Sequence, residues 1–356
     1  MVGTRPTELR LTLAPQRRFE AIDVTKRIAQ EAGDILRRHQ RALYCSFHTT
    51  AGYLDQSLSL RLGNNQDHLS QFVGTFRELF PEGAEYHHDR MELRTELSED
   101  QRRVEPRNAD SHLAFIGAGL RNCVAYRTQP TAPVYFVELD GTSEAMRRQR
   151  STAVLAYDDE RVVARSAVCI PVSKHPIDSV NLGDPRLGVI AQLNDLLAAS
   201  GVERARVDLM LEPTERNVGL TVNEYETLLM QHDLVDVLRN PLRFARIQGR
   251  ELLEDPLAIA GKTLSYARYD VVRVLNSLME ALGLDQSSLE RLVAKVMSVP
   301  ARRFLRSRRV SFFARSEPGH PAARIVRGTY QSPILVQWQS AERQARRVDI
   351  AVVQLS

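Results

Sequence analysis

Hydrophobic and polar positions along the first half of the chain follow two periods. Phe19 to Val24 and Tyr44 to Phe47 carry the apolar, aromatic and β-branched residues that are typical of strands. Between them, residues 25–38 place apolar side chains on one face at helical spacing, which predicts a helix. A second helix is predicted over residues 65–80, and Pro81 ends it.

A charged and irregular stretch, residues 82–110, follows the second helix. Long irregular loops in compact domains are often functional. Two further strands are predicted at Val134 to Val137 and at Thr152 to Tyr157. We place a domain boundary after them and divide the chain into residues 1–165 and 166–356.

The order of elements begins again in the second half. Asp184 is a predicted N-cap and Pro185 the first residue of a helix. A strand over residues 207–211 and a second helix over residues 224–238 follow. His232 lies on the apolar stripe of that second helix, which predicts a buried histidine within the core.

One insertion interrupts the second half. Amphipathic spacing over residues 264–282 and a capping-box pattern that opens at Ser287 predict helices within an insertion at about residues 243–305. Two strands, over residues 334–338 and 348–355, then close the chain. Strands and helices in both halves predict an α+β protein.

The composition agrees with two globular domains. A length of 356 residues exceeds the usual ceiling for a single core, and 43% apolar with 26% charged residues does not favour disorder. The three cysteines are widely spaced, which fits a reducing cytoplasm better than a disulfide scaffold. Residues 1–18 do not resemble a secretory signal, and no run of about twenty apolar residues predicts a membrane span. We therefore expect a soluble cytoplasmic protein with no membrane partner.

The charge pattern does not favour nucleic acid as a partner. The chain has 48 basic and 44 acidic residues, and the net charge of +4 is a weak global field. The densest basic run, Arg302 to Arg309, contains one aromatic residue. Such a run fits a helix surface or an acidic partner equally well.

His48, His88 and His112 each stand in a short polar phrase at a predicted strand end or loop, where site residues are common. An imidazole binds metals and moves protons near neutral pH. Asp89 and Asp110 place carboxylates beside two of the three histidines. Together these phrases predict a polar pocket.

Two kinds of chemistry fit this pocket. Three neutral imidazoles with one carboxylate suit zinc or another divalent metal, with His48, His88 and His112 as ligands and one position open for substrate. The same imidazoles suit anion binding and proton transfer without a metal, and spacing alone does not choose. Thr49 and Thr50 follow His48 and either donate hydroxyls to a substrate oxygen or bond the strand end.

With these phrases in view, residues 19–157 resemble the YjbQ family, also called the secondary thiamine-phosphate synthase family. The matching positions are His48, Thr49, Thr50, Ala51, Gly52, Tyr86, His88, Asp89, Asn108, Ala109, Asp110, His112, Glu138, Asp140, Gly141, Arg147, Arg148 and Arg150. The chain departs from the family where Leu54 to Gln56 replace an Asn-Glu pair, and where Gln129 to Ala132 replace a Gly-Thr-Trp-Gln phrase.

Residues 175–356 resemble a diverged second copy of the same family, with nearly opposite departures. Gly219 to Glu224 matches the segment that follows the histidine phrase, and Gly328 to Gln331 matches the Gly-Thr-Trp-Gln phrase. Glu215 to Val218 stands where the histidine phrase belongs. The resemblance therefore implies two tandem YjbQ-like β-sandwich repeats with flanking helices, the second carrying the helical insertion.

The family resembles a small β-sandwich protein that assembles as a trimer with its site near subunit contacts. The resemblance therefore implies a homo-oligomer, a ring or trimer of repeats, in which one repeat completes the site of another. The residues expected to face one another across this contact are His48, His88 and His112 on one side and Asn223, Glu224 and Gln331 on the other.

The family's reaction joins a pyrimidine diphosphate to a thiazole phosphate and releases pyrophosphate. The resemblance implies a transfer of this kind on a small-molecule phosphate or heterocycle, and the alternative is a non-catalytic ligand-binding or assembly protein derived from the same fold. The residues implied in catalysis are His48, Thr49, His88, Asp89, His112 and Glu224. Those implied in substrate binding are Thr50, Asn108, Asp110, Arg147, Asn223 and Gln331. Arg148 and Arg150 add charge for a departing pyrophosphate, although the same run also fits a solvated face.

Overall fold

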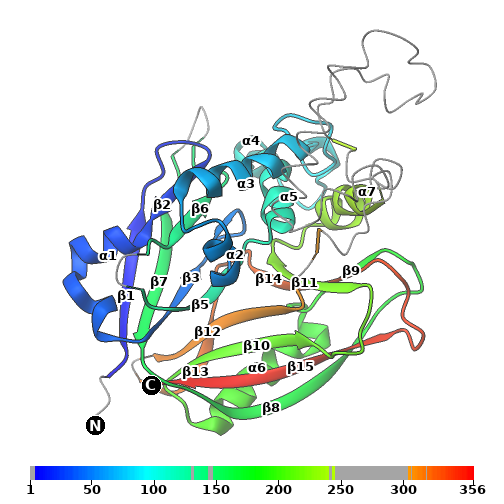
Figure 1. The fold of residues 1–356 in the computed structure, drawn as a ribbon. Helices are drawn as coiled ribbons and strands as arrows, with labels where there is room; N and C mark the ends of the chain where they lie inside the picture. The colour runs from blue at the N-terminus through cyan, green and yellow to red at the C-terminus, as the bar shows by residue number, and fades with distance from the viewer. Residues whose placement is uncertain are drawn as a thin grey trace, which may run out of the picture.

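The computed structural model describes residues 5–129, 132–142, 147–239, 243–244, 304–305, 307–317 and 319–356. The predicted helices over residues 264–282 and from Ser287 lie outside these residues. The described part of the chain is an α+β fold of antiparallel sheets and helices (Figure 1).

The first half contains one four-stranded and one three-stranded sheet. The four-stranded sheet has the order β1 (Thr7–Leu13), β7 (Arg150–Tyr157), β3 (Arg41–Ser46), β5 (Cys123–Arg127). The three-stranded sheet has the order β2 (Glu20–Asp23), β6 (Tyr135–Glu138), β4 (Ala51–Gly52). All of these pairings are antiparallel.

The described residues of the second half form two sheets whose strand orders correspond to those of the first half. The larger sheet has the order β8 (Glu160–Pro171), β15 (Ala345–Leu355), β10 (Arg204–Leu211), β12 (Arg309–Glu317), β13 (His320–Val326). The smaller sheet has the order β9 (Asp178–Asn181), β14 (Ser332–Gln337), β11 (Val218–Asn223). Strand β13 is the addition relative to the first half, and the predicted boundary after residue 165 falls inside β8.

The described helices lie between the strands in chain order. Their bounds in the first half are α1 (Val24–Ala32), η1 (Gly33–Arg38), α2 (Gln56–Arg61), α3 (Gln66–Leu79), η2 (Met91–Leu93), α4 (Glu99–Val104) and α5 (Ala109–Ala118). Their bounds in the second half are η3 (Pro185–Leu187), α6 (Val189–Ser200), η4 (Leu229–Asp233) and α7 (Leu234–Arg239).

Local capping signals account for where several of these helices begin and end. Asn65 caps α3, because its Oδ1 accepts the backbone N–H groups of Asp67 and His68. The predicted helix over residues 25–38 is divided at Gly33, whose φ of 63° lies in a region that glycine adopts without strain. Asp184 caps the predicted helix, but that helix is a single turn, and α6 starts only at Val189.

The prediction that His232 is buried is wrong. The helix predicted over residues 224–238 begins with a π-helical turn, η4, before α7. A π turn shifts the positions that follow relative to the expected stripe, so that Asp233 is buried and His232 is exposed. The ring of His232 stacks on that of His87 with 5.1 Å between the centroids.

The four-stranded sheet is buried on both faces. Along β3, Ala42 and Tyr44 join a core cluster that includes residues of α1, and Leu43 and Cys45 point to the opposite face, as the two-residue period of a strand requires. On that face the cluster also contains Phe313 of β12. The large sheets of the two halves therefore pack against each other.

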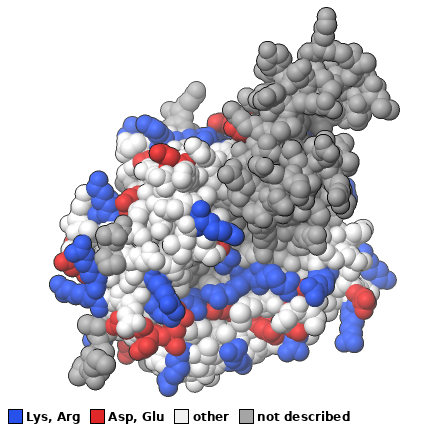
Figure 2. Space-filling view, in the orientation of Figure 1, with Lys and Arg blue, Asp and Glu red and all other residues white. Residues whose placement is uncertain are grey.

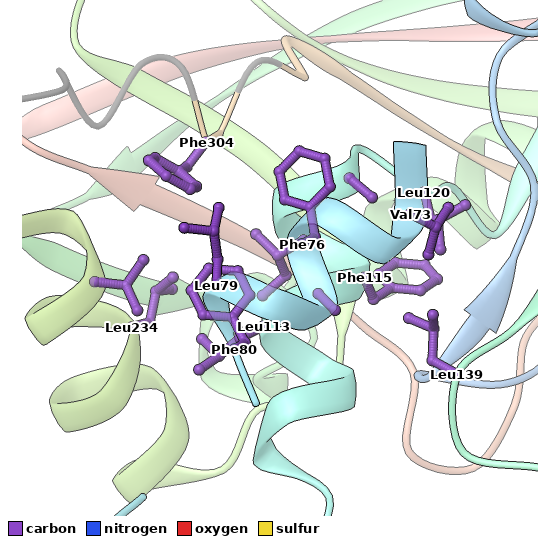
Figure 3. Close-up of a cluster of buried hydrophobic side chains, with 14 of the residues drawn as sticks. Val73, Phe76, Leu79, Phe80, Leu113, Phe115, Leu120, Leu139, Leu234 and Phe304 are labelled. Atoms are coloured by element: carbon purple, nitrogen blue, oxygen red, sulfur yellow. The ribbon is translucent and has the colours of Figure 1, made fainter. Parts of the chain in front are cut away.

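The two halves also share a core beneath the helices. Figure 3 shows Phe76 and Leu79 of α3 and Leu113 of α5 near Leu234 of α7. The same cluster includes Val336 of β14. Because these side chains are buried by residues from both halves, their burial stabilises the contact between the halves as well as each half itself.

The surface carries charges of both signs. In Figure 2, basic side chains form a band across the middle of the visible face and acidic ones are interspersed with them. Within the described part of the basic run, Arg308 donates to the carbonyl oxygens of Glu215 and Glu212, and Arg309 lies 3.4 Å from Asp208. None of the helices in the described ranges combines the length and the apolar character needed to cross a bilayer.

Gly328 packs closely against the loop that carries His48. A Cβ at Gly328 would lie 1.9 Å from the carbonyl oxygen of Phe47, so Gly328→Ala forces the two backbones apart. We expect a loss of about 1–3 kcal/mol in the free energy of unfolding, measured by urea denaturation. The matched control is Gly74→Ala in α3, which meets nothing within 4 Å and is expected to be neutral or stabilising. Equal stability of the two variants would contradict this close packing.

Candidate functional site at the junction of the two halves

The predicted site residues come together where the loops of the first half meet β11 and β14. His48 lies between β3 and β4, His88 follows α3, and His112 lies in α5, which stands above β11 in Figure 1. A cavity of about 440 Å³ opens at this junction. It is lined by Phe47, His48, Thr49, Thr50, Glu105, Pro106, Asn108, Asp140, Arg147, Arg148, Gln149, Arg150, Glu224 and Tyr330.

Asn223 fixes the tautomer of His112. Its Oδ1 accepts the backbone N–H of Glu224 at 2.8 Å, and its Nδ2 donates to the carbonyl oxygen of Thr49 at 3.2 Å, so the amide has one orientation. His112 Nδ1 lies 2.6 Å from that Oδ1 and must therefore carry the proton. In the neutral ring Nε2 is unprotonated, and it lies 3.8 Å from Oε2 of Glu224.

Burial determines the charge of this pair. Desolvation, together with the charge of His88, lowers the pKa of His112 to about 3, so the ring is neutral at pH 7. Desolvation also raises the pKa of Glu224; His88 opposes this rise and Glu105 adds to it. The Glu224 side chain is 22% exposed and lines the cavity, whereas His112 is buried behind it. Glu224 is therefore the titratable group of this pair that a ligand reaches.

His88 forms a buried ion pair with the second half. Its Nδ1 lies 3.0 Å from Oε2 of Glu226, and both side chains are almost completely buried. Desolvation raises the pKa of Glu226, but hydrogen bonds from His88 and from the N–H groups of Leu228 and Leu229 lower it to about 2. Desolvation lowers the pKa of His88, but Glu226 and Asp89 raise it above its ordinary value. These contacts favour the charged form of both partners.

Asp233, also from the second half, holds the backbone of the His88 loop. Its carboxylate accepts the N–H groups of His87 and His88 at 2.8 and 2.9 Å and is fully buried. Asp233 and Glu226 were not predicted from the sequence, because neither stands in a phrase of its own. They are two of four carboxylates in residues 224–238, and no local signal distinguishes them from Asp236.

A chain of polar groups connects His88 to the cavity. Oδ1 of Asn108 lies 3.4 Å from His88 Nε2, and Nδ2 of Asn108 donates to Oδ2 of Asp140 at 2.8 Å. Arg148 donates to the same carboxylate oxygen of Asp140 at 2.6 Å. Arg150 is paired with the fully buried carboxylate of Glu138 and lies 3.1 Å from Thr50 Oγ1.

His48 is a neutral ring at the edge of the cavity. Its Nε2 accepts the backbone N–H of Ser151 at 2.8 Å, so Nδ1 carries the proton. Desolvation and the charges of Arg150 and Arg148 lower the pKa of His48 to about 4. Gln331 holds this loop from the second half, since its Nε2 donates to the carbonyl oxygen of His48 at 2.9 Å.

The remaining predicted residues lie around this centre. Asp89 accepts the N–H of Ala109 at the start of α5. Asp110 accepts two hydrogen bonds from Arg18 Nη2, at 2.8 and 2.9 Å, and one from Ser111 Oγ at 3.4 Å, and desolvation raises its pKa to about 6. Neither carboxylate lines the cavity, whereas the exposed Arg147 does.

The three histidines do not form a ligand set for one metal ion. His48 Nε2 accepts the N–H of Ser151, and both ring nitrogens of His88 have partners, Glu226 at Nδ1 and Asn108 at Nε2, so neither ring offers a free lone pair to a metal. Across the described ranges, no three His, Cys, Asp or Glu side chains are grouped so that they would hold a metal. These contacts do not favour the predicted divalent metal.

The chain has only a weak similarity to known proteins. No protein-family model and no curated protein matches the chain. A YbjQ-like protein of unknown function from Sulfolobus solfataricus P2 is 14% identical, covering 55% of this chain and 99% of its own, with a TM-score of 0.29. A hypothetical protein from Aeropyrum pernix K1 is 13% identical, covering 53% of this chain and 97% of its own, with a TM-score of 0.28.

A third similar structure carries the family name. An uncharacterized conserved protein of the YjbQ family from Clostridium acetobutylicum is 12% identical, covering 52% of this chain and 98% of its own, with a TM-score of 0.24. The structural similarity to proteins described in this way thus extends over about half of the chain. TM-scores this low do not establish a shared fold, so the family stays a proposal.

The buried pair of His88 and Glu226 predicts a pH-dependent contribution to stability. Glu226 has a lowered pKa, so its contribution is present above about pH 4.3 and is lost as the pH falls toward about 2. His88 has a raised pKa, so its contribution is present below about pH 6.5 and is lost as the pH rises through the folded pKa. We expect Glu226→Gln to lose about 3 kcal/mol in the free energy of unfolding near pH 5.5 and less at pH 3 or pH 9.

The matched control for this variant is Glu96→Gln. Glu96 also pairs with a cation, Arg94, but its side chain is 52% exposed. An exposed pair contributes at most about 1 kcal/mol. Urea denaturation at the three pH values measures both variants, and a deficit for Glu226→Gln that does not vary with pH would contradict the charge assignment.

Proposed function

We propose that the chain consists of two tandem YjbQ-like repeats that build one site from complementary parts. The corresponding strand orders of the two halves support this proposal. The contacts of His112 with Asn223 and of His48 with Gln331 also support it, because we expected these residues to face one another between repeats. In this chain the neighbouring repeat is the second half of the same polypeptide.

We further propose that the site belongs to an enzyme acting on a small phosphorylated or heterocyclic substrate, in a thiamine-phosphate-synthase-like transfer. One observation carries this proposal. Glu224, beside the neutral His112, and the arginines at 147, 148 and 150 line the same cavity. A proton-carrying group and an anion-binding wall are what a transfer that releases pyrophosphate requires.

The roles of the residues follow from their contacts. Arg148 and Arg150 are held by Asp140 and Glu138, so their guanidinium groups are in place before a diphosphate binds, and they stabilise the charge of the departing pyrophosphate. Glu224 holds or releases a proton at the heterocycle. His112 does not line the cavity and is a positioning residue, since its unprotonated Nε2 lies behind the carboxyl, 3.8 Å from Oε2 of Glu224.

Glu224→Gln tests the proton-transfer role. The amide keeps the shape of the side chain but carries no exchangeable acid, so we expect kcat to fall by about 10²-fold or more. The measurement is the release of pyrophosphate and the formation of thiamine phosphate from the pyrimidine diphosphate and the thiazole phosphate.

The control for Glu224→Gln is Glu99→Gln, on the exposed side of α4, which is expected to keep wild-type activity. Unchanged activity of Glu224→Gln would contradict the proposed role. Binding of the two substrates without any turnover by the wild-type protein would contradict the enzyme and favour the alternative of a non-catalytic binding protein.

The predicted divalent metal and the predicted homo-oligomer stay predictions. Elemental analysis of the purified protein checks the first, and light scattering of the eluted protein checks the second. Neither result changes the assignment of Glu224, because its contacts are made within one chain.

A further inference from the structure

An arginine lies at the start of the last strand of each large sheet, Arg150 in β7 and Arg346 in β15. Each reaches back to a side chain at the end of the strand before it. Arg150 pairs with Glu138 of β6, and Arg346 donates to Oε1 of Gln337 in β14. Each also donates to the backbone carbonyl two residues after that side chain, Arg150 to Asp140 and Arg346 to Gln339. The two arginines therefore occupy corresponding positions in the two halves.

In the second half, a carboxylate completes this arrangement. Oε2 of Glu215 accepts from Nη1 of Arg346 at 2.9 Å. Its Oε1 accepts the backbone N–H of Arg347, the residue that follows, at 2.8 Å. Both the guanidinium and the adjacent backbone donor are satisfied by one side chain.

In the first half, His48 stands in the place of Glu215. Its Nε2 accepts the backbone N–H of Ser151, the residue that follows Arg150. Its Nδ1 lies 3.5 Å from Nη1 of Arg150, where the second oxygen of Glu215 would be. His48 Nε2 thus replaces Oε1 of Glu215 as an acceptor. His48 Nδ1, at the place of Oε2, is a donor instead of an acceptor.

Two donors consequently face each other at the wall of the cavity. Nδ1 of His48 carries a proton because Nε2 is the accepting nitrogen, and an arginine has no acceptor atom. Arg150 is only 6% exposed, and Nη1 has no acceptor among the residues that the structure describes. A buried donor left without an acceptor costs about 1–3 kcal/mol.

We propose that the space between His48 Nδ1 and Arg150 Nη1 is a subsite for one oxygen of an oxyanion, a phosphate or a carboxylate. The two nitrogens are 3.5 Å apart, so one oxygen beside them can bridge both at about 2.9 Å from each. The carboxylate of Glu215 is the built-in occupant of the corresponding place in the second half. His48 is then a neutral hydrogen-bond donor to the ligand.

This subsite deepens the proposed function and rests on it only for the choice of the cavity. Both residues line that cavity, and the Arg148 guanidinium lies beside them. The neighbouring Asp140 carboxylate is already bonded to Arg148 and Asn108, so its charge is compensated at short range. Binding of an oxyanion can be measured without turnover, so the two proposals fail separately.

The test is His48→Glu in the full chain, which supplies the carboxylate that Glu215 supplies in the second half. We expect the Kd for inorganic phosphate and for pyrophosphate, measured by calorimetry, to rise at least about tenfold. The thermal midpoint is expected to stay at or above that of the wild type. His68→Glu, with the same charge change on the exposed surface of α3, is the matched control and should bind as the wild type does.

A second variant and a measurement on the wild type complete the test. In His48→Gln the amide oxygen can accept from Ser151 while its nitrogen donates to the anion, so most of the binding should remain. In the wild type, titration with phosphate should shift the ¹⁵N resonance of His48 Nδ1 while the ring keeps its neutral tautomer. Acetate, titrated in parallel, separates a carboxylate site from a phosphate site.

Three results would overturn the proposal. They are unchanged phosphate binding by His48→Glu, the absence of binding of all three anions by the wild type, and a His48 resonance that does not respond to a bound anion. Phosphate binding that His48→Glu abolishes, in a protein without turnover, would contradict the proposed enzyme and leave the subsite standing.

Discussion

The hydrogen bond between His112 and Asn223 is the interaction on which the rest of the site depends. Both side chains are buried, so neither can exchange its partner for water, and loss of one leaves the other unsatisfied at a cost of about 1–3 kcal/mol. The bond fixes the tautomer of the imidazole, and the same amide anchors the backbone of Glu224. The carboxyl therefore reaches the cavity only when the two halves are docked.

At this junction, carboxylates of the second half contact histidines of the first half. The second half supplies the acidic groups Glu224, Glu226 and Asp233, and the first half supplies the histidines and the arginines of the cavity. Each buried cation or carboxylate near the centre has a partner that offsets its desolvation. Attraction across the junction consequently acts together with the shared apolar core to hold the halves in register.

The parts of the structure that the sequence predicted are those determined by neighbouring residues. Helix α3, Gln66–Leu79, lies where the pattern placed it, over residues 65–80, because the apolar period and the following Pro81 are local signals. Glu226 was missed because its partner, His88, is 138 residues away, and no local pattern marks such a contact. His232 was misplaced because a π turn changes the period on which the prediction relied.

A site built from two halves of one polypeptide has a fixed stoichiometry. When separate subunits complete each other's sites, dilution dissociates them and the sites are lost by mass action. Here the residues on both sides, such as His112 and Asn223, belong to one polypeptide. Their effective concentration is therefore high and does not depend on the protein concentration. Each half is also free to vary at the positions that the other supplies.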